Sequence, residues 1–119
     1  MTEVYYTEAF ETWWNTLNEE EQKKTAFVIR LLEEKGKTLA LPYSRNKIYQ
    51  ARHELRELRV QYRGQPYRIL YVFDPLETAI LLLGGSKKGD DRWYKKHIPQ
   101  AEKIYEEHLE TLKQEGKIT

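Results

Sequence analysis

The stretch ELRVQYRGQPYRILYVFDPLETAILLLGG, residues 57–85, decides the fold. Residues 53–62 and 67–73 place alternate side chains on opposite faces, which is the two-residue period of a β-strand. Residues 78–83 are almost wholly apolar, as expected for a strand that is buried on both faces. Turn-forming residues at 63–66 and 74–75 separate the three runs, and links this short predict an antiparallel meander.

Two amphipathic helices are predicted before this sheet, after a short strand at residues 3–6. Thr7 is the predicted N-cap of the first helix, and Asn18 with Glu21 three residues later forms a capping-box pattern for the second. Gly36 lies where the second helix is expected to end. A short link joins the two helices as an antiparallel hairpin. Apolar residues at helical spacing predict one buried face on each helix, formed by Phe10, Trp13, Trp14 and Leu17 on the first and by Phe27, Val28, Leu31 and Leu32 on the second.

The remaining segments are predicted to be loops and one final helix. Residues 37–50 form a connecting loop, Gly84-Gly85 ends the third strand of the meander, and residues 86–91 form a polar loop. Residues 92–97 make a helical turn, and Pro99 suits the first turn of the final helix. The apolar face of that helix is formed by Ala101, Ile104, Tyr105, His108, Leu109 and Leu112. The predicted fold is therefore α+β, with an N-terminal helical hairpin packed on a small twisted antiparallel sheet and a C-terminal helix.

Length and composition favour one soluble domain over residues 1–119, expected in the cytoplasm. Hydrophobic residues make up 39% of the 119 positions and aromatic residues 13%, which is too apolar for a disordered chain. The longest purely apolar run, residues 79–83, is too short to cross a membrane, and the N-terminus lacks a signal-peptide pattern. The absence of cysteine excludes thiol catalysis and cysteine-based zinc sites. The three histidines show no metal-ligand spacing, so neither a metal nor a cofactor is expected.

Basic residues gather in the middle of the chain. Residues 43–97 carry twelve Lys or Arg against six Asp or Glu, whereas residues 1–42 and 98–119 are each net acidic. A positive segment of this kind is typical of a surface that meets phosphate groups. Lysines and arginines along exposed sheet edges also serve solubility alone, so charge by itself leaves both interpretations open.

Four cations of this segment are predicted to converge on one patch. Arg59 and Arg68 fall at facing positions on either side of the turn at 63–66, and Lys87 and Lys88 follow the third strand. Two arginines on one face repel each other unless they are solvated or given an anion, which makes an anion site one hypothesis. The alternative is a surface network in which Glu57 and other acids pair with the arginines. Aromatic candidates to flank the patch are Tyr67, Trp93, Tyr94 and His97.

These residues resemble the RelE/HigB superfamily of type II toxins, and in particular the phage-derived HigB-like group. The resemblance covers residues 5–109 and depends on a combination of short motifs. They are Glu57-Leu58-Arg59, Pro66-Tyr67-Arg68-Ile69-Leu70-Tyr71, Ile80-Leu81-Leu82-Leu83-Gly84-Gly85, Lys87-Lys88 and Ile98-Pro99-Gln100-Ala101.

The resemblance implies a RelE-like fold and a toxin of a type II toxin–antitoxin system that inhibits growth as a ribosome-dependent mRNA endoribonuclease. It implies no metal, and its expected partners are mRNA on the ribosome and a cognate antitoxin, often a helix-turn-helix DNA-binding protein. By motif match, Arg59, Arg68, Lys87 and Lys88 inherit the catalytic expectation. Further candidates for RNA binding are Lys47, Arg52, Arg56, Tyr67, Arg92 and Trp93.

Metal-independent cleavage would use the 2′-hydroxyl of the RNA as the nucleophile. Arg59 and Arg68 would then stabilise the transition-state charge, and Lys87 or Lys88 would transfer one proton. Tyr94 or His97 would supply the second proton-transfer group, and a base would stack on Trp93. Two alternatives stay open: a non-cleaving basic module that binds nucleic acid or protein, and a toxin of the same fold that acts on a protein such as gyrase.

Overall fold

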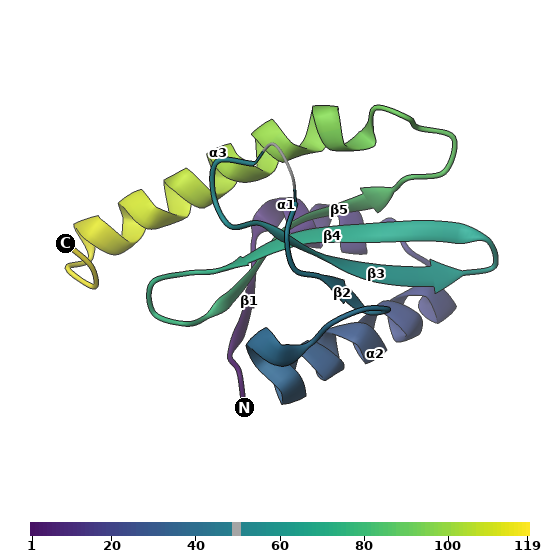
Figure 1. The fold of residues 1–119 in the computed structure, drawn as a ribbon, viewed down its shortest axis with the longest axis horizontal. Helices are drawn as coiled ribbons and strands as arrows, with labels where there is room; N and C mark the ends of the chain where they lie inside the picture. The colour runs from purple at the N-terminus through teal and green to yellow at the C-terminus, as the bar shows by residue number, and fades with distance from the viewer. Residues whose placement is uncertain (49–50) are drawn as a thin grey trace.

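The computed structural model describes residues 1–48 and 51–119. In this part of the chain, five strands form one sheet in the order β1-β5-β4-β3-β2 (Figure 1). Their bounds are β1 Val4–Tyr6, β2 Ser44–Arg45, β3 Arg56–Tyr62, β4 Gln65–Phe73 and β5 Ala79–Ser86. The predicted meander is confirmed, because β3, β4 and β5 pair antiparallel in sequence order.

The helices begin where their caps predict. Helix α1, Glu8–Trp14, starts after Thr7, whose hydroxyl accepts a hydrogen bond from the Phe10 amide. Helix α2, Glu19–Lys35, starts with both hydrogen bonds of the Asn18–Glu21 capping box, and a 3₁₀ turn, η1 Gly36–Thr38, follows it. The C-terminal helix α3 spans Trp93–Gln114. No helix in the described residues is both long and apolar enough to span a membrane.

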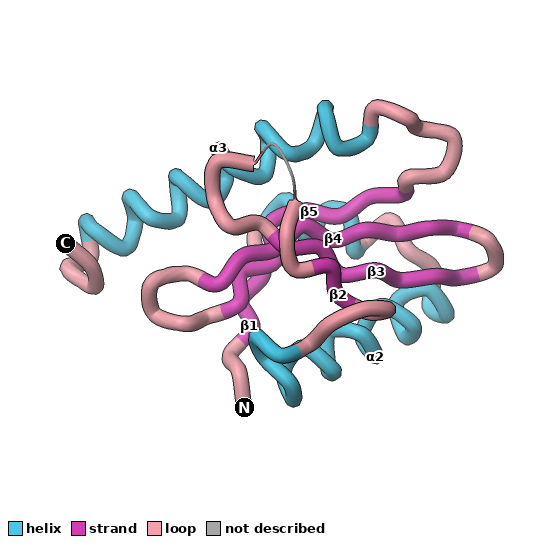
Figure 2. Tube along the Cα trace, viewed as in Figure 1, coloured by secondary structure: helices cyan, strands magenta, loops and turns pink. Residues whose placement is uncertain are grey.

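The sheet has helices on both of its faces (Figure 2). One core forms between the sheet and helices α1 and α2, and the other between the sheet and α3. Alternate residues of β4 supply the two cores: Ile69 and Tyr71 face α1 and α2, whereas Leu70 and Val72 face α3. The side chains of any one strand are therefore divided between two different environments.

Three features of the sheet and helices differ from the predictions. Strand β1 pairs parallel with β5, so the sheet is mixed rather than antiparallel. The predicted loop over 37–50 contains β2, which pairs with only two residues of β3. Residues 49 and 50 of that predicted loop lie outside the described part of the chain. Helix α3 starts at Trp93 with Pro99 inside it, so the helical turn at 92–97 and the final helix are one element.

Gly84 and Gly85 do not end the third strand, because β5 continues to Ser86. A Cβ on Gly84 would lie 2.4 Å from Cε3 of Trp13, and a Cβ on Gly85 would lie 2.9 Å from Nε1 of Trp93. The two indoles therefore pack against the bare backbone from opposite faces of the sheet. The glycine pair is a packing requirement within the strand rather than a turn signal.

The outward face of α2 contains one residue that was predicted to be buried. Val28 and Leu32 are buried as expected, but Phe27 is 51% exposed. Its ring contacts the ring of Tyr43, which precedes β2 and is itself partly exposed. Helical spacing alone placed Phe27 at the margin of the apolar face, and the packing of α2 on β3 leaves it outside the core.

Candidate functional site

A row of charged side chains crosses the face of the sheet that α3 partly covers. Strand register places Arg45 of β2 opposite Glu57 of β3, and Arg59 of β3 opposite Arg68 of β4. Residues opposite each other in paired strands share a face, and so do residues two apart along one strand. The four side chains therefore converge from three strands. The predicted cross-strand pairing of Arg59 with Arg68 is confirmed.

Glu57 is at the centre of this row and is fully buried. The Arg68 Nε lies 3.4 Å from its Oε1, and the Arg45 guanidinium lies 3.5 Å from its Oε2. The Tyr94 hydroxyl, from the first turn of α3, donates a 2.6 Å hydrogen bond to Oε1. One buried carboxylate thus holds two arginines and a tyrosine in fixed positions. We call Arg45, Glu57, Arg59, Arg68, Lys87 and Tyr94 the Glu57 cluster.

The charge of the cluster is unbalanced. Arg68 is almost as buried as Glu57, whereas Arg59 and Arg45 are partly exposed. Four cationic side chains therefore surround a single carboxylate, and within the described residues neither Glu57 Oε2 nor Arg68 Nε has a hydrogen-bond partner. A partly desolvated site with excess positive charge is suited to an anion such as a phosphate group.

Lys87 lies at the margin of this cluster, just beyond the end of β5. Its Nζ is 5.0 Å from the centre of the Tyr94 ring. Burial, and then the nearby charge of Arg68, lowers the pKa of the Lys87 ammonium. Burial and the hydrogen bond to Glu57 raise the pKa of the Tyr94 phenol. The site therefore places an amine that loses its proton more easily than usual beside a phenol that holds its proton more firmly.

The other predicted catalytic residues lie around this cluster or away from it. The Lys88 side chain is exposed, and its backbone amide is bonded to the Ser86 hydroxyl. His97 stacks on Trp93 with ring centres 4.4 Å apart, and its Nδ1 lies 2.7 Å from the Trp93 carbonyl oxygen. Trp93, the first residue of α3, is 2% exposed and belongs to the core between α3 and the sheet. The expectation that a base stacks on Trp93 is wrong for this conformation, because its ring is covered by Gly85 and His97.

The predicted RNA-binding residues are scattered. Tyr67 is buried on the opposite face of the sheet, where its hydroxyl donates to Glu21, so it cannot flank the patch. Arg52 pairs with Glu102 and Glu106, and Arg56 stacks over Phe73 and donates to the Lys37 carbonyl. The exposed Lys47 lines a cavity of about 430 Å³ with these two arginines. Arg92 is exposed before α3. None of these predicted RNA-binding residues is a member of the Glu57 cluster.

Sequence reasoning missed two members of the cluster. Arg45 lies in the segment read as a loop, where a two-residue strand gives no period to detect. Glu57 was considered only as a surface partner of the arginines. The alternation of residues 57–61 did put Glu57 on the face of Arg59, but its burial is completed by distant segments, among them α3, whose Tyr94 contacts it.

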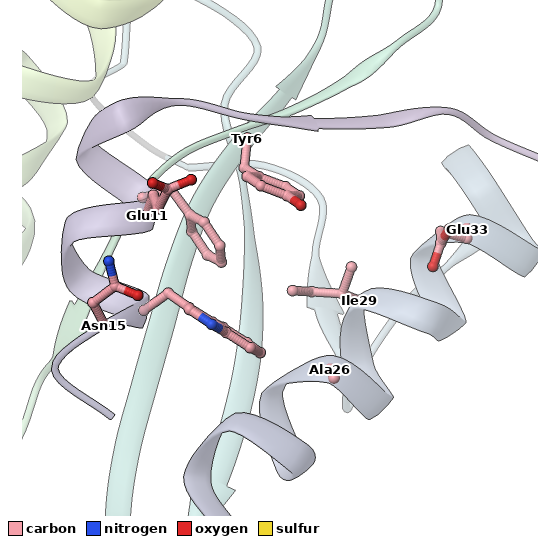
Figure 3. Close-up of a pocket in the computed structure, with 8 residues that line it drawn as sticks. Tyr6, Glu11, Asn15, Ala26, Ile29 and Glu33 are labelled. Atoms are coloured by element: carbon pink, nitrogen blue, oxygen red, sulfur yellow. The ribbon is translucent and has the colours of Figure 1, made fainter. Parts of the chain in front are cut away.

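A second cavity, of about 400 Å³, lies between α1 and α2 on the other face of the sheet (Figure 3). Tyr6 and Ile29 point into this space, and Glu11 and Glu33 are at its margins. Its acidic rim is unsuited to a phosphate group. Across the described residues, no group of three His, Asp or Glu side chains is placed to hold a metal ion.

Comparison with known proteins gives a consistent set of relatives. Residues 12–106 match the family described as phage-derived protein Gp49-like. The chain is 40% identical over 100 residues to the proposed toxin HigB3 of Mycobacterium tuberculosis, with 83% of this chain and 86% of that protein aligned. It is 35% identical over 105 residues to the proposed toxin HigB2 of the same organism, with 86% of this chain aligned, and spans about half of that protein's length (52%).

A solved structure shares the fold. It is a double arginine-to-alanine variant of the Escherichia coli toxin RelE in the free state, which superimposes with a TM-score of 0.55. The match covers 77% of this chain and 90% of the other chain at 13% sequence identity. The predicted RelE-like fold is therefore confirmed.

Proposed function

The chain belongs to the phage-derived Gp49-like family within the RelE/HigB superfamily of toxins, and we propose that it is a ribosome-dependent endoribonuclease that cuts mRNA without a metal ion. The observation that carries the proposal is the Glu57 cluster, in which Arg45, Arg59, Arg68 and Lys87 surround one buried carboxylate beside Tyr94. As a toxin of the RelE/HigB type, the chain acts with an antitoxin partner.

The arginines would bind the scissile phosphate. RNA cleavage through the 2′-hydroxyl gathers negative charge on the phosphate oxygens in the transition state. Donors fixed in advance contribute most to such a step, since they need not reorganise as the charge develops. Glu57 holds Arg68 in position through their ion pair, which makes Glu57 a positioning residue. Arg59 is partly exposed and is placed to contact the phosphate directly.

Lys87 and Tyr94 would transfer the two protons. Neutral Lys87 takes the proton of the 2′-hydroxyl as its oxygen attacks phosphorus. The bond from phosphorus to the 5′-oxygen then breaks, Tyr94 protonates that oxygen, and the 3′ end of the upstream fragment is left as a 2′,3′-cyclic phosphate. The lowered pKa of Lys87 supports its assignment as the base, because a base must be neutral to accept a proton. The assignment of Tyr94 rests on its position, since its ring lies beside the Lys87 ammonium and its hydroxyl is part of the Glu57 cluster. Lys88 and His97 stay as alternatives for the same two steps.

The proposed substrate is mRNA in the ribosomal A site, and the proposed antitoxin is a helix-turn-helix DNA-binding protein. The partly exposed arginines of the cluster, Arg45 and Arg59, form a small surface at the β2–β3 edge of the sheet. Such a surface needs its RNA strand to be held from outside, which the ribosome would provide. Action in the cytoplasm is part of the same proposal.

The proposal is tested by inducible expression in a bacterial host with mapping of mRNA 5′ ends. The wild-type chain should arrest growth and create new 5′ ends, and an Arg59→Ala/Arg68→Ala variant should do neither. The matched control is Arg30→Ala/Lys117→Ala, which removes two cations from exposed ion pairs and should behave as wild type.

Two outcomes would contradict the proposal. Growth arrest with intact mRNA would indicate a protein target such as gyrase. Folded protein that causes neither arrest nor new 5′ ends would indicate a module that binds without cleaving.

A further inference from the structure

A second surface adjoins the Glu57 cluster at the β3 edge of the sheet. It is a cavity of about 420 Å³ between α2, the loop before β2 and strand β3. Strand β2 pairs only with Glu57 and Leu58, so in the described part of the chain the edge of β3 that faces away from β4 has no strand paired with it beyond Leu58. The cavity is lined by Lys24, Phe27, Val28, Pro42, Tyr43, Arg59, Gln61 and Arg68.

Two aromatic rings at this cavity face solvent. Phe27 is 51% exposed and Tyr43 is 38% exposed, and their ring centres lie 6.2 Å apart with the planes inclined at 72°. The hydrogen bond from the Arg59 amide to the Tyr43 carbonyl anchors the loop that carries Tyr43. The two rings are therefore held in place without being covered, and they present apolar faces of the size of a nucleobase.

Polar groups on the same cavity complement a nucleotide. Lys24 and Arg59 line the same cavity as the rings and supply positive charge, and the exposed amide of Gln61 can both donate and accept hydrogen bonds. Aromatic faces beside cations are the combination by which proteins hold single-stranded nucleic acid, since every base offers a face for stacking. A protein partner would not by itself call for this alternation of rings and cations.

The cavity is continuous with the proposed site of cleavage. Arg59 and Arg68 line the cavity and also belong to the Glu57 cluster. A strand whose scissile phosphate lies on these arginines would therefore have a neighbouring base within reach of Phe27 and Tyr43.

We propose that the surface formed by Lys24, Phe27, Tyr43 and Gln61 binds single-stranded RNA, with a base stacked on Phe27 or Tyr43 and a phosphate on Lys24. This inference rests on the proposed function and deepens it, because it names the subsite that holds the nucleotide next to the one that is cut.

The test measures the binding of a fluorescently labelled single-stranded oligoribonucleotide to the full chain by anisotropy at low salt. A Phe27→Leu/Tyr43→Leu variant keeps apolar bulk and removes both rings. It should bind about 10-fold more weakly, which corresponds to about 1.4 kcal/mol. The matched control is Tyr5→Leu/Tyr6→Leu, which removes two rings that are at least as exposed, at the opposite edge of the sheet, and should bind within about 2-fold of wild type.

Two further measurements separate stacking from other causes. An oligoribonucleotide with abasic positions should bind the wild-type chain and the leucine variant equally, because no base is left to stack. A Phe27→Tyr/Tyr43→Phe variant keeps both rings and should restore binding. Lys24→Ala should lower the dependence of binding on salt, whereas the leucine variant should leave it unchanged.

The inference is overturned if the leucine variant binds RNA as tightly as the wild type does. It is also overturned if the leucine variant keeps its affinity for RNA and loses only its affinity for the antitoxin. That failure is distinct from failure of the proposed function. A wild-type chain that creates new 5′ ends while the leucine variant binds RNA normally would refute this surface alone. A wild-type chain that creates none would refute the nuclease.

Discussion

Two buried carboxylates, Glu57 and Glu102, are each reached by an arginine, yet their surroundings differ. Glu102, on α3, is 4% exposed and accepts hydrogen bonds from the backbone amides of Arg52 and His53, the second at 3.0 Å. Its arginine, Arg52, is mostly exposed and also pairs with Glu106. The partners of Glu57 are instead the side chains of Arg45, Arg68 and Tyr94.

The difference separates a structural carboxylate from a functional one. The hydrogen bonds from two backbone amides fix the position of Glu102, so this residue holds the segment before β3 against the C-terminal helix. Side chains from three other elements meet at Glu57, and they bring more positive charge than the carboxylate balances. A buried carboxylate that accepts hydrogen bonds from backbone amides serves as a structural anchor. A buried carboxylate that is surrounded by more cations than it can balance indicates a site that can bind a second anion.

The largest effect is expected from Glu57→Ala. Removing the carboxylate leaves Arg68 buried without its counter-charge, and breaking a buried pair in this way costs about 3–5 kcal/mol of unfolding free energy. Urea denaturation of the purified chain measures the loss. The companion variant, Glu57→Leu/Arg68→Met, replaces both charges by apolar groups and should regain most of the stability while remaining unable to cut RNA. A double variant that is as unstable as Glu57→Ala would contradict this account.

Arg59→Ala should weaken catalysis without unfolding the protein. Its side chain is partly exposed, so its loss should change the unfolding free energy little. If Arg59 contacts the phosphate in the transition state, cleavage should slow by about 2–4 kcal/mol of barrier, or roughly 30- to 1,000-fold. Single-turnover cleavage of mRNA on programmed ribosomes measures the rate. A variant that cuts at the wild-type rate would remove Arg59 from the site.

Glu102→Ala should destabilise the protein without weakening catalysis, which is the opposite of the result expected for Arg59→Ala. It leaves the amides of Arg52 and His53 without their acceptor and should cost about 1–3 kcal/mol of unfolding free energy. Hydrogen exchange should accelerate at these two amides first, because they lose their acceptor directly. Cleavage by the folded fraction should match wild type. A large loss of activity would mean that this anchor also shapes the site.

The smallest effect is a displacement of the pH profile. Because the pKa of Lys87 is lowered by burial and by Arg68, its neutral fraction at a given pH exceeds that of an ordinary lysine. If neutral Lys87 is the base, the cleavage rate should rise with pH and level off below pH 10.5, the ordinary lysine value. Lys87→Ala should lose this rise, and Lys88→Ala should keep it. The reverse pattern would assign the base to Lys88.

The sequence predicted four of the six members of the Glu57 cluster, and for Arg59 and Arg68 two local rules were sufficient to predict that they lie together. Period-two alternation and a short turn place Arg59 opposite Arg68, and both rules act within residues 57–70. The contacts made by Arg45 and Tyr94 join distant segments and could not be predicted in this way. Arg45 is in a strand too short to show a pattern, and Tyr94 reaches Glu57 across 37 positions. Tyr67 and Trp93 were misplaced because aromatic residues serve equally well in cores and on binding surfaces.

The glycine pair at 84 and 85 also gives the protein a built-in optical probe on each face of the sheet. Of the three tryptophans, Trp13 and Trp14 lie on the α1 side, and Trp93 lies on the α3 side. The tryptophan emission of a Trp13→Phe/Trp14→Phe chain would therefore come from Trp93 alone, which is next to Tyr94 of the Glu57 cluster. Its fluorescence would report occupancy of the cluster without an attached label, and the Trp93→Phe chain would report the opposite face.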